Sequence, residues 1–394
     1  MDVEALKSLQ TPFYLYDDHL LRQTLSALNA ALAGKENYHV HYAIKANANP
    51  KLLALIREAG LGIDCVSGGE LQRAIHCGFS PGKIVFAGVG KTDEEINLAL
   101  DHDIFCLNVE SKAELEVVQE LAEAKGKRIG ICLRINPDVG AHTHAHITTG
   151  LAENKFGIAM EDMVPLIREA QHMPNIRLIG LHFHIGSQIL EMDDFRQLCL
   201  RINELQGQLE QESINIEVIN VGGGLGIDYA QPHEHPIPDF QAYIDTFATH
   251  LQLRPGQSLH FEPGRSITAQ CGSLITRVTY VKQGTHKQFA IVDAGMNDLI
   301  RPALYQAHHF IDNISATGNL CLGEKPADVM QWEDYDVVGP VCESSDVFGK
   351  DERLPLTRRG DLLALRSAGA YGEIMASQYN CRPFPKGYLL SELA

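Results

Sequence analysis

A lysine stands where a buried strand is expected to end. The run "VHYAIK" (40–45) is apolar enough for a buried strand, and Lys45 closes it. Burial lowers the pKa of a lysine, and the free amine can then form a Schiff base with an aldehyde. A strand-end lysine more commonly reaches solvent. The short motif "IKAN" by itself does not decide between the two interpretations.

A glycine run and an arginine later in the chain suggest an anionic ligand. In "NVGGGLGIDY" (220–229), Gly222, Gly223 and Gly224 would let backbone N–H groups approach a phosphate. In "FEPGR" (261–265), Gly264 would add a backbone contact and Arg265 would bind a phosphate or carboxylate oxygen. Glu262 would face the same region. The alternative is a surface ion pair between Glu262 and Arg265.

Two histidines close another strand, "LHFHIGSQ" (181–188). Alternation puts His182 and His184 on one face, where one ring can lie flat against a ring-shaped ligand. Single histidines at strand ends are commonly core residues. The second histidine favours a role at a ligand.

The last third of the chain offers a proton donor and a polar pair. Cys342 precedes Glu343 in "GPVCESSDVFG", and an unperturbed thiol with a pKa near about 8.5 keeps its proton at neutral pH. Arg301 and Tyr305 share a face if their segment is helical. An ordinary loop cysteine and a solvated arginine are the alternatives. The run "HTHAH" (142–146) has no acidic or cysteine partner nearby, so no metal site is expected.

The elements that would position these residues alternate between strands and helices. Eight strands are expected, at 40–45, 62–67, 83–88, 104–110, 129–136, 178–186, 216–224 and 258–264. Polar residues or glycines end most of them, which favours a (β/α)₈ TIM-like barrel with its chemistry at the C-terminal ends of the strands. A doubly wound open sheet is the rival, but it would gather chemistry mainly at one switch point.

Past Glu262 the helices disappear and strands dominate, which predicts a β-rich domain of sandwich or barrel type. The predicted domains are a barrel over 36–267 and a β-rich domain over 1–35 plus 268–394. A short N-terminal strand at 12–17 is expected to complete the second domain.

Composition narrows the function classes. The 394 residues carry a net charge of −17, which disfavours binding to nucleic acid and to anionic membranes. No apolar run approaches the length of a membrane span, and the N-terminal segment is not a signal peptide. Nine scattered cysteines, an odd number without a CxxC pair, indicate a reducing cytoplasm.

The motifs together resemble one enzyme family from about residue 11 to residue 383. In chain order they are "HYAIKAN", "GIDCVSGGEL", "IVFAGVGKT", "NVES", "RINPDV", "TTGLAENKFGI", "HIGSQI", "VGGGLGIDY", "FEPGRSI", "NDLIRPALY", "GPVCESSDVFGKD" and "SAGAYG". This series resembles the diaminopimelate decarboxylases, fold-type III pyridoxal-phosphate enzymes of lysine biosynthesis with an alanine racemase-like architecture.

The resemblance implies a cofactor site for pyridoxal 5'-phosphate. Lys45 would hold the cofactor as an internal aldimine, Glu262 would keep the pyridine nitrogen protonated, and His184 would stack on the ring. The phosphate and its surroundings would be bound by Ser187, Gly222, Gly223, Gly224, Gly264, Arg265 and Tyr371.

The resemblance also implies a substrate site and a homodimer. Meso-2,6-diaminopimelate would lose carbon dioxide and become L-lysine, with Cys342 as the proton donor. Cys342 and Glu343 would come from the partner subunit. The substrate's charged groups would be bound by Arg265, Arg301, Tyr305, Glu343 and Tyr371.

Three alternatives remain open at this point. A related decarboxylase could act on ornithine, arginine, carboxynorspermidine or a carrier-bound amino acid, but these substrates would not need Arg301. An alanine racemase-like enzyme on a similar barrel would need a proton donor on each face of the ring and would release no carbon dioxide. The second domain, with "CESSD" and "GAYG", disfavours a non-catalytic cofactor carrier. Two departures stand out: the histidine-rich loop at 141–150, and an end so soon after "YNCRPFPKG" that a further strand and helix are expected to be missing.

Overall fold

The computed structural model describes residues 3–140, 155–323 and 331–393. The chain divides into two compact units. The first, here called the β-rich unit, comprises Met1–Thr24, Ile227–Pro238 and Arg265–Ala394. The second, the barrel unit, comprises Leu25–Gly226 and Asp239–Gly264.

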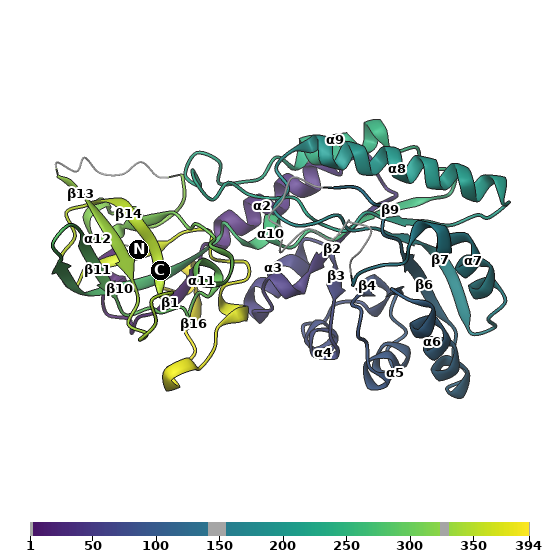
Figure 1. Ribbon diagram of the computed structural model, residues 1–394, viewed down its shortest axis with the longest axis horizontal. Helices are drawn as coiled ribbons and strands as arrows, with labels where there is room; N and C mark the ends of the chain where they lie inside the picture. Colours follow the sequence, from purple (N-terminus) through teal and green to yellow (C-terminus); the bar gives the residue numbers. More distant parts are fainter. Residues whose placement is uncertain (1–2, 141–154, 324–330, 394) are drawn as a thin grey trace. The chain divides into compact units, whose positions relative to one another are not determined.

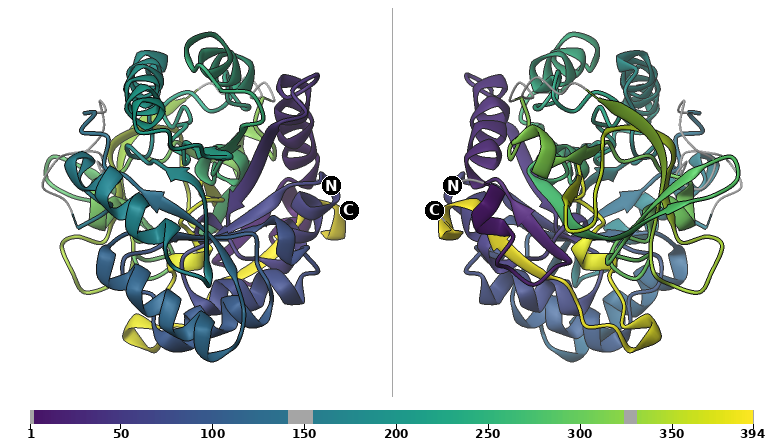
Figure 2. Two further views of the ribbon diagram at one scale, coloured as in Figure 1. Left: turned by 90° about the vertical axis from the view of Figure 1, so that its right-hand side faces the viewer. Right: turned by 90° about the vertical axis from the view of Figure 1, so that its left-hand side faces the viewer.

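The barrel unit is built on a closed barrel of eight parallel strands in chain order, β2 to β9 (Figures 1 and 2). All eight predicted strands form, and closure through β2 and β9 rules out the open sheet. The strands are β2 Tyr38–Ala43, β3 Gly62–Cys65, β4 Ile84–Phe86, β5 Cys106–Val109, β6 Ile129–Arg134, β7 Ile176–His182, β8 Val218–Asn220 and β9 Ser258–Phe261.

Short polar residues start several of the helices just after the strands. Ser67, Thr92 and Ser111 each accept a hydrogen bond from a backbone N–H in the first turn of the helix that follows. Because these caps start the helices, the connections from strand to helix are short, and the C-terminal ends of the strands lie together at one mouth of the barrel. The helices are α2 Asp18–Ala31, α3 Pro50–Glu58, α4 Gly68–His76, α5 Asp93–Asp101, α6 Lys112–Ala124, α7 Met160–Gln171, α8 Met192–Gln211 and α9 Phe240–His250, with the 3₁₀ turns η1 Ile44–Ala46 and η2 Pro81–Lys83.

The floor of the barrel is filled by stacked rings. His41 lies parallel to His260 with ring centroids 5.1 Å apart, and Phe105 stacks on His260 at 5.3 Å. Nε2 of His41 lies 2.8 Å from Nδ1 of His260. Burial lowers the pKa of His260 to about 2, so its ring is neutral.

The β-rich unit contains an eight-stranded mixed sheet with the order β12-β15-β10-β11-β13-β14, to which β1 and β16 are attached. The strands are β1 Phe13–Tyr16, β10 Gly272–Gln283, β11 Gln288–Val292, β12 Ile311–Asn313, β13 Trp332–Val338, β14 Val347–Pro355, β15 Leu362–Leu365 and β16 Lys386–Leu389. The predicted N-terminal strand is confirmed, because β1 pairs antiparallel with β10.

After the motif "YNCRPF" the chain forms one more strand and a short helix. Strand β16 pairs in parallel with β1 (Figure 1). Helix α13 Leu390–Leu393 follows it. The edge of β1 that faces away from β10 holds this last segment. The other short elements of the unit are α1 Val3–Leu6, α10 Arg265–Thr268, α11 Arg301–Tyr305, α12 Ile314–Thr317, η3 Glu373–Met375 and η4 Tyr379–Cys381.

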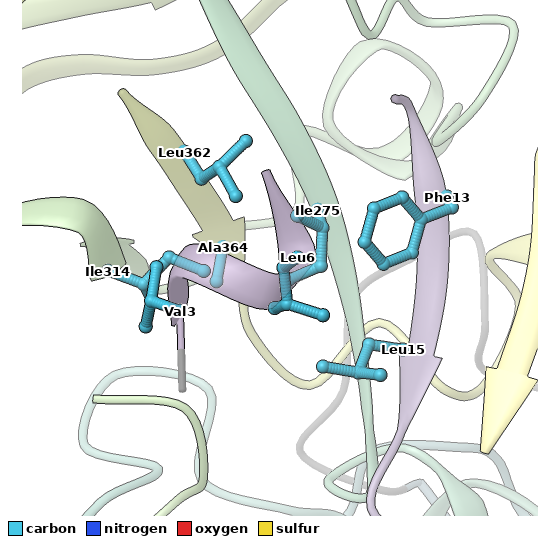
Figure 3. Packing of buried hydrophobic residues seen from close by; sticks show 8 residues of the cluster. All are labelled: Val3, Leu6, Phe13, Leu15, Ile275, Ile314, Leu362 and Ala364. Atoms are coloured by element: carbon cyan, nitrogen blue, oxygen red, sulfur yellow. The ribbon is translucent and has the colours of Figure 1, made fainter. Parts of the chain in front are cut away.

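An apolar cluster fastens the N-terminal segment to this sheet. Side chains from α1 and β1 pack against β10, α12 and β15, as Figure 3 shows: Val3, Leu6, Phe13, Leu15, Ile275, Ile314, Leu362 and Ala364. Each large apolar side chain buried there contributes about 1.5–3 kcal/mol. The N-terminal segment is therefore part of the core of the β-rich unit.

No helix in the described ranges is long and apolar enough to cross a membrane.

Candidate active site

Lys45 lies in the turn η1, directly after β2, at the mouth of the barrel. Its Nζ is 3.5 Å from Oδ2 of Asp64, which stands on the neighbouring strand β3 beside Ala43. The Lys45 side chain is 41% exposed, whereas that of Asp64 is 1% exposed. The amine is therefore within reach of a ligand at the mouth, with one carboxyl group behind it.

Asp64 can take up a proton more readily than an ordinary aspartate. Burial raises its pKa well above the usual value, the charge of Glu262 raises it further, and Lys45 opposes both. An amine must lose its proton before it can attack a carbonyl carbon. Asp64 is placed to accept that proton from Lys45.

Glu262 is a buried carboxylate held by three donors from three strands. Its Oε1 accepts from Nδ2 of Asn220 at 2.7 Å and from Nδ2 of Asn108 at 3.2 Å. Its Oε2 lies 2.9 Å from Nε2 of His182. Burial alone would raise its pKa, but His182, Lys45 and Asn220 hold the pKa well below the usual value. Glu262 therefore places a fixed negative charge at the mouth, which suits a protonated ring nitrogen.

The two histidines of the "LHFHIG" strand have separate environments. His182 ends β7 and reaches Glu262, whereas His184 lies two residues beyond it. Nδ1 of His184 accepts a hydrogen bond from the backbone N–H of Gly223 at 3.3 Å. Burial, with the charges of Arg134 and Lys45, lowers the pKa of His184 well below its usual value. The ring of His184 is neutral, as a ring that stacks on a ligand would be.

The three glycines are required first by close packing of the backbone. A Cβ at Gly223 would lie 2.2 Å from the backbone oxygen of Glu262, and one at Gly222 would lie 2.5 Å from that of Phe183. Gly222 also has a φ of +69°. The N–H of Gly222 already donates to Oδ1 of Asn220 at 2.9 Å. Phosphate binding by these amides therefore stays a prediction.

Gly264 and Ser187 complete the predicted cofactor set in the barrel unit. A Cβ on Gly264 would lie 3.0 Å from that of Ala43 and 3.1 Å from that of Ala46. Gly264 therefore packs against the turn that carries Lys45. Ser187 is partly buried in the segment that follows β7.

The β-rich unit contains two buried arginines around one tyrosine. Arg265 donates from a terminal nitrogen (NH1) to the hydroxyl of Tyr229 at 2.7 Å, and its guanidinium also lies 4.8 Å from the ring centroid of Tyr371. The Arg301 guanidinium lies 5.1 Å from the ring of Tyr229, and its Nε is 3.4 Å from Nε2 of His309. Burial lowers the pKa of His309 to about 3, so that partner is neutral.

No carboxylate pairs with the guanidinium of Arg301 within 3–140, 155–323 and 331–393. Arg301 is only 6% exposed, and burial lowers its pKa. Such a charge is costly without an anionic partner. This arrangement is what a binding site for a carboxylate of a ligand requires. Tyr371 beside it has a φ of +57°, a strained conformation of the kind that gathers at functional sites.

The remaining predicted residues lie in the same unit. Tyr305 ends α11, one turn after Arg301, and is partly exposed. Cys342 and Glu343 are both exposed. A carboxylate oxygen of Glu343 accepts a hydrogen bond from the hydroxyl of Tyr379.

Sequence reasoning missed several side chains that hold these groups. They are Asp64, Asn108, His182, Asn220, Tyr229 and His309, none of which was assigned its observed role. Asn108 and Asn220 each interrupt an otherwise apolar strand, which was an available signal for a polar group inside the barrel. Tyr229 and His309 lie in loop segments and gave no such signal.

No group of three or more histidine, cysteine, aspartate or glutamate side chains in the described part of the chain could hold a metal ion. His142, His144 and His146 lie outside the described residues.

Comparison with known proteins identifies the family. Residues 19–269 match the family model of the pyridoxal-dependent decarboxylases, pyridoxal binding domain. A diaminopimelate decarboxylase from Bacteroides thetaiotaomicron is 62% identical over 391 residues, covering 99% of this chain and 98% of that protein. A diaminopimelate decarboxylase from Pseudomonas aeruginosa is 44% identical over 372 residues, which are 94% of this chain and 86% of that protein.

Solved structures of the same family resemble this chain in fold. The crystal structure of diaminopimelate decarboxylase from Helicobacter pylori, complexed with L-lysine, has a TM-score of 0.89 and 40% identity, covering 99% of this chain and 94% of that one. A lysine/ornithine decarboxylase from Vibrio vulnificus has a TM-score of 0.81 at 22% identity over 99% of this chain and 97% of that one, which is a likeness of fold alone. The chain belongs to the diaminopimelate decarboxylases, a family of pyridoxal-dependent lyases.

Proposed function

We propose that this chain converts meso-2,6-diaminopimelate to L-lysine and carbon dioxide with the residues described above, in the cytoplasm. The observation that carries the proposal is the pairing of a reachable Lys45 with a buried, ionised Glu262 at one barrel mouth. A covalent aldehyde cofactor with a protonated ring nitrogen needs these two groups. The nine free cysteines, two of them exposed, fit a reducing compartment.

The residues present fit pyridoxal 5'-phosphate. Lys45 would bind it covalently, after Asp64 has taken the proton from its amine. Glu262 would hold the proton on the ring nitrogen, and His184 would stack on the ring. When bound, the cofactor supplies an electron-accepting ring that stabilises negative charge on the substrate carbon. The phosphate would be bound by Ser187, Gly222, Gly223, Gly224, Gly264, Arg265 and Tyr371.

Arg301 would select the substrate by its distal carboxylate. Its guanidinium is buried and has no carboxylate partner among the described residues, and Tyr305 and Glu343 would contact the neighbouring polar groups of the substrate. A substrate that lacks this carboxylate would leave Arg301 buried and unpaired, which can discriminate by roughly 10⁴-fold. A decarboxylase of simple diamino acids has no need of such a residue.

Cys342 would deliver a proton to the carbon from which carbon dioxide departs. Cys342 and Glu343 are exposed on the single chain, which supports their contribution to the site of a second copy in a homodimer. Two inactive variants then test the sharing. Lys45→Ala and Cys342→Ala subunits, mixed so that they exchange, would regain about a quarter of the wild-type rate if each site uses both chains. No recovery in verified mixed dimers would contradict the shared site.

Carbon dioxide release tests the reaction itself. The cofactor-loaded protein would be given meso-diaminopimelate beside L,L-diaminopimelate, L-lysine, L-ornithine, L-arginine and carboxynorspermidine. Release from the meso isomer alone, with lysine as product, is expected. Release from another substrate would overturn the role of Arg301 and leave the roles of Lys45 and Glu262 standing.

A further inference from the structure

His182 is a buried imidazole with only half of its hydrogen bonds satisfied. It is 2% exposed at the end of β7, and its Nε2 lies 2.9 Å from Oε2 of Glu262. Its Nδ1 is buried and has no hydrogen-bond partner in the described ranges of the chain. Buried polar atoms normally have partners. An imidazole retained in this state is expected to do something that a fully satisfied or an apolar side chain could not.

The contact with Glu262 fixes where the proton of this imidazole lies. An ionised carboxylate only accepts hydrogen bonds, so Nε2 must carry the hydrogen that it donates to Oε2. His182 therefore serves Glu262 as a hydrogen-bond donor through Nε2, and its contact leaves the carboxylate available to a further donor.

The two oxygens of Glu262 differ in what they can still bind. Oε1 accepts from both Asn108 and Asn220. Oε2 accepts from His182 alone among the described residues, although each carboxylate oxygen has about two acceptor positions. Oε2 is thus the oxygen with a position left for a further donor, and His182 sets its direction.

We propose that His182 is a positioning residue that aims Oε2 of Glu262 at the ring nitrogen of the cofactor. The inference rests on the proposed function to the extent that Glu262 is the residue that meets the ring nitrogen. It differs from a structural role because it acts only through Glu262.

A double-mutant cycle between His182 and Glu262 tests this dependence. His182→Leu removes the donor and keeps an apolar side chain, and His182→Gln restores an N–H donor. Each is made in the wild-type protein and in Glu262→Gln. Asn108→Leu is the matched control, because it removes a donor from Oε1, which still has Asn220. The measurements are the visible absorbance and the dissociation constant of bound pyridoxal phosphate, together with kcat and KM.

His182→Leu is expected to lower kcat by about 10- to 100-fold, the effect of losing one hydrogen bond to a charged group, with KM changed less than about twofold. Cofactor binding should weaken several-fold, and His182→Gln should recover most of both. In Glu262→Gln, the change to leucine should have no further effect. Asn108→Leu should weaken cofactor binding less than His182→Leu does.

An equal loss in the Glu262→Gln background would overturn the proposal, because His182 would then act without Glu262. Unchanged cofactor absorbance and binding in His182→Leu would overturn it as well. Cofactor binding is measured without turnover, so the inference survives if only the substrate assignment fails. A wild-type protein that binds no pyridoxal phosphate would refute the inference and the proposed function together.

Discussion

Replacing Arg301 by methionine should make the protein more stable and less active at the same time. The guanidinium is 6% exposed, its nearest polar partner is the neutral His309 at 3.4 Å, and the charge of Arg265 lowers its pKa further after burial. A buried charge without a counter-ion costs about 3–5 kcal/mol. The cation–π contact with Tyr229 offsets about 1–2 kcal/mol of this cost. The free energy of unfolding of the variant should therefore rise by about 1–4 kcal/mol.

The activity should change in the opposite direction. Loss of a desolvated, charge-assisted contact to the distal carboxylate costs about 2–5 kcal/mol, or roughly 30- to 5,000-fold in kcat/KM for meso-diaminopimelate. L-ornithine lacks that carboxylate, so the variant should release no less carbon dioxide from L-ornithine than the wild-type protein does. The discrimination between the two substrates, rather than either rate alone, reports the role of Arg301.

The assay is urea unfolding of the cofactor-free protein beside steady-state carbon dioxide release from both substrates. Arg353→Met is the control, because that arginine is 62% exposed in a surface pair with Asp334 and should affect neither measurement by more than about 1 kcal/mol. A variant that is less stable than wild type and keeps its preference for meso-diaminopimelate would refute the reasoning. It would show that Arg301 has a structural partner and no role in recognition.

Three further outcomes follow from other parts of the structure. Gly223→Ala should lower the free energy of unfolding by at least about 3 kcal/mol, because the new Cβ would lie 2.2 Å from a backbone oxygen. Gly207→Ala, which has open space around it in helix α8, should raise the free energy of unfolding by about 0.5–1 kcal/mol in the same urea titration. Burial raises the pKa of Asp298 from 3.8 to about 6, so its ionisation destabilises the folded state as pH rises through about 6. The free energy of unfolding of Asp298→Asn should therefore exceed that of wild type by about 2–3 kcal/mol at pH 8 and by little at pH 4. An equal difference at both pH values would be contrary evidence. Asp64→Asn should slow covalent attachment of pyridoxal phosphate to Lys45 by about 100-fold, followed by visible absorbance, and an unaltered rate would show that Asp64 takes no proton from the amine.

Local pattern was enough to predict the barrel and the residues at its mouth. Apolar runs of strand length, each closed by a polar residue or glycine, predicted all eight strands, and the parallel barrel gathers such ends on one side. Lys45 and Glu262 were found in this way, because each directly follows an apolar run. The N-terminal strand and the β-rich unit were predictable for the same reason.

The tertiary structure decided the charge state and the hydrogen-bond partners of each of these residues. Glu262 is ionised because Asn108, His182 and Asn220 reach it from three other strands, and no spacing in the sequence shows that they converge. Arg301 reads as a helix-face arginine, and only folding reveals that it is buried without a carboxylate. Burial and hydrogen bonds between residues far apart in the sequence determine the pKa values and the acceptor positions that stay open. The sequence alone therefore identifies the chemical groups, and the fold determines what each group can bind.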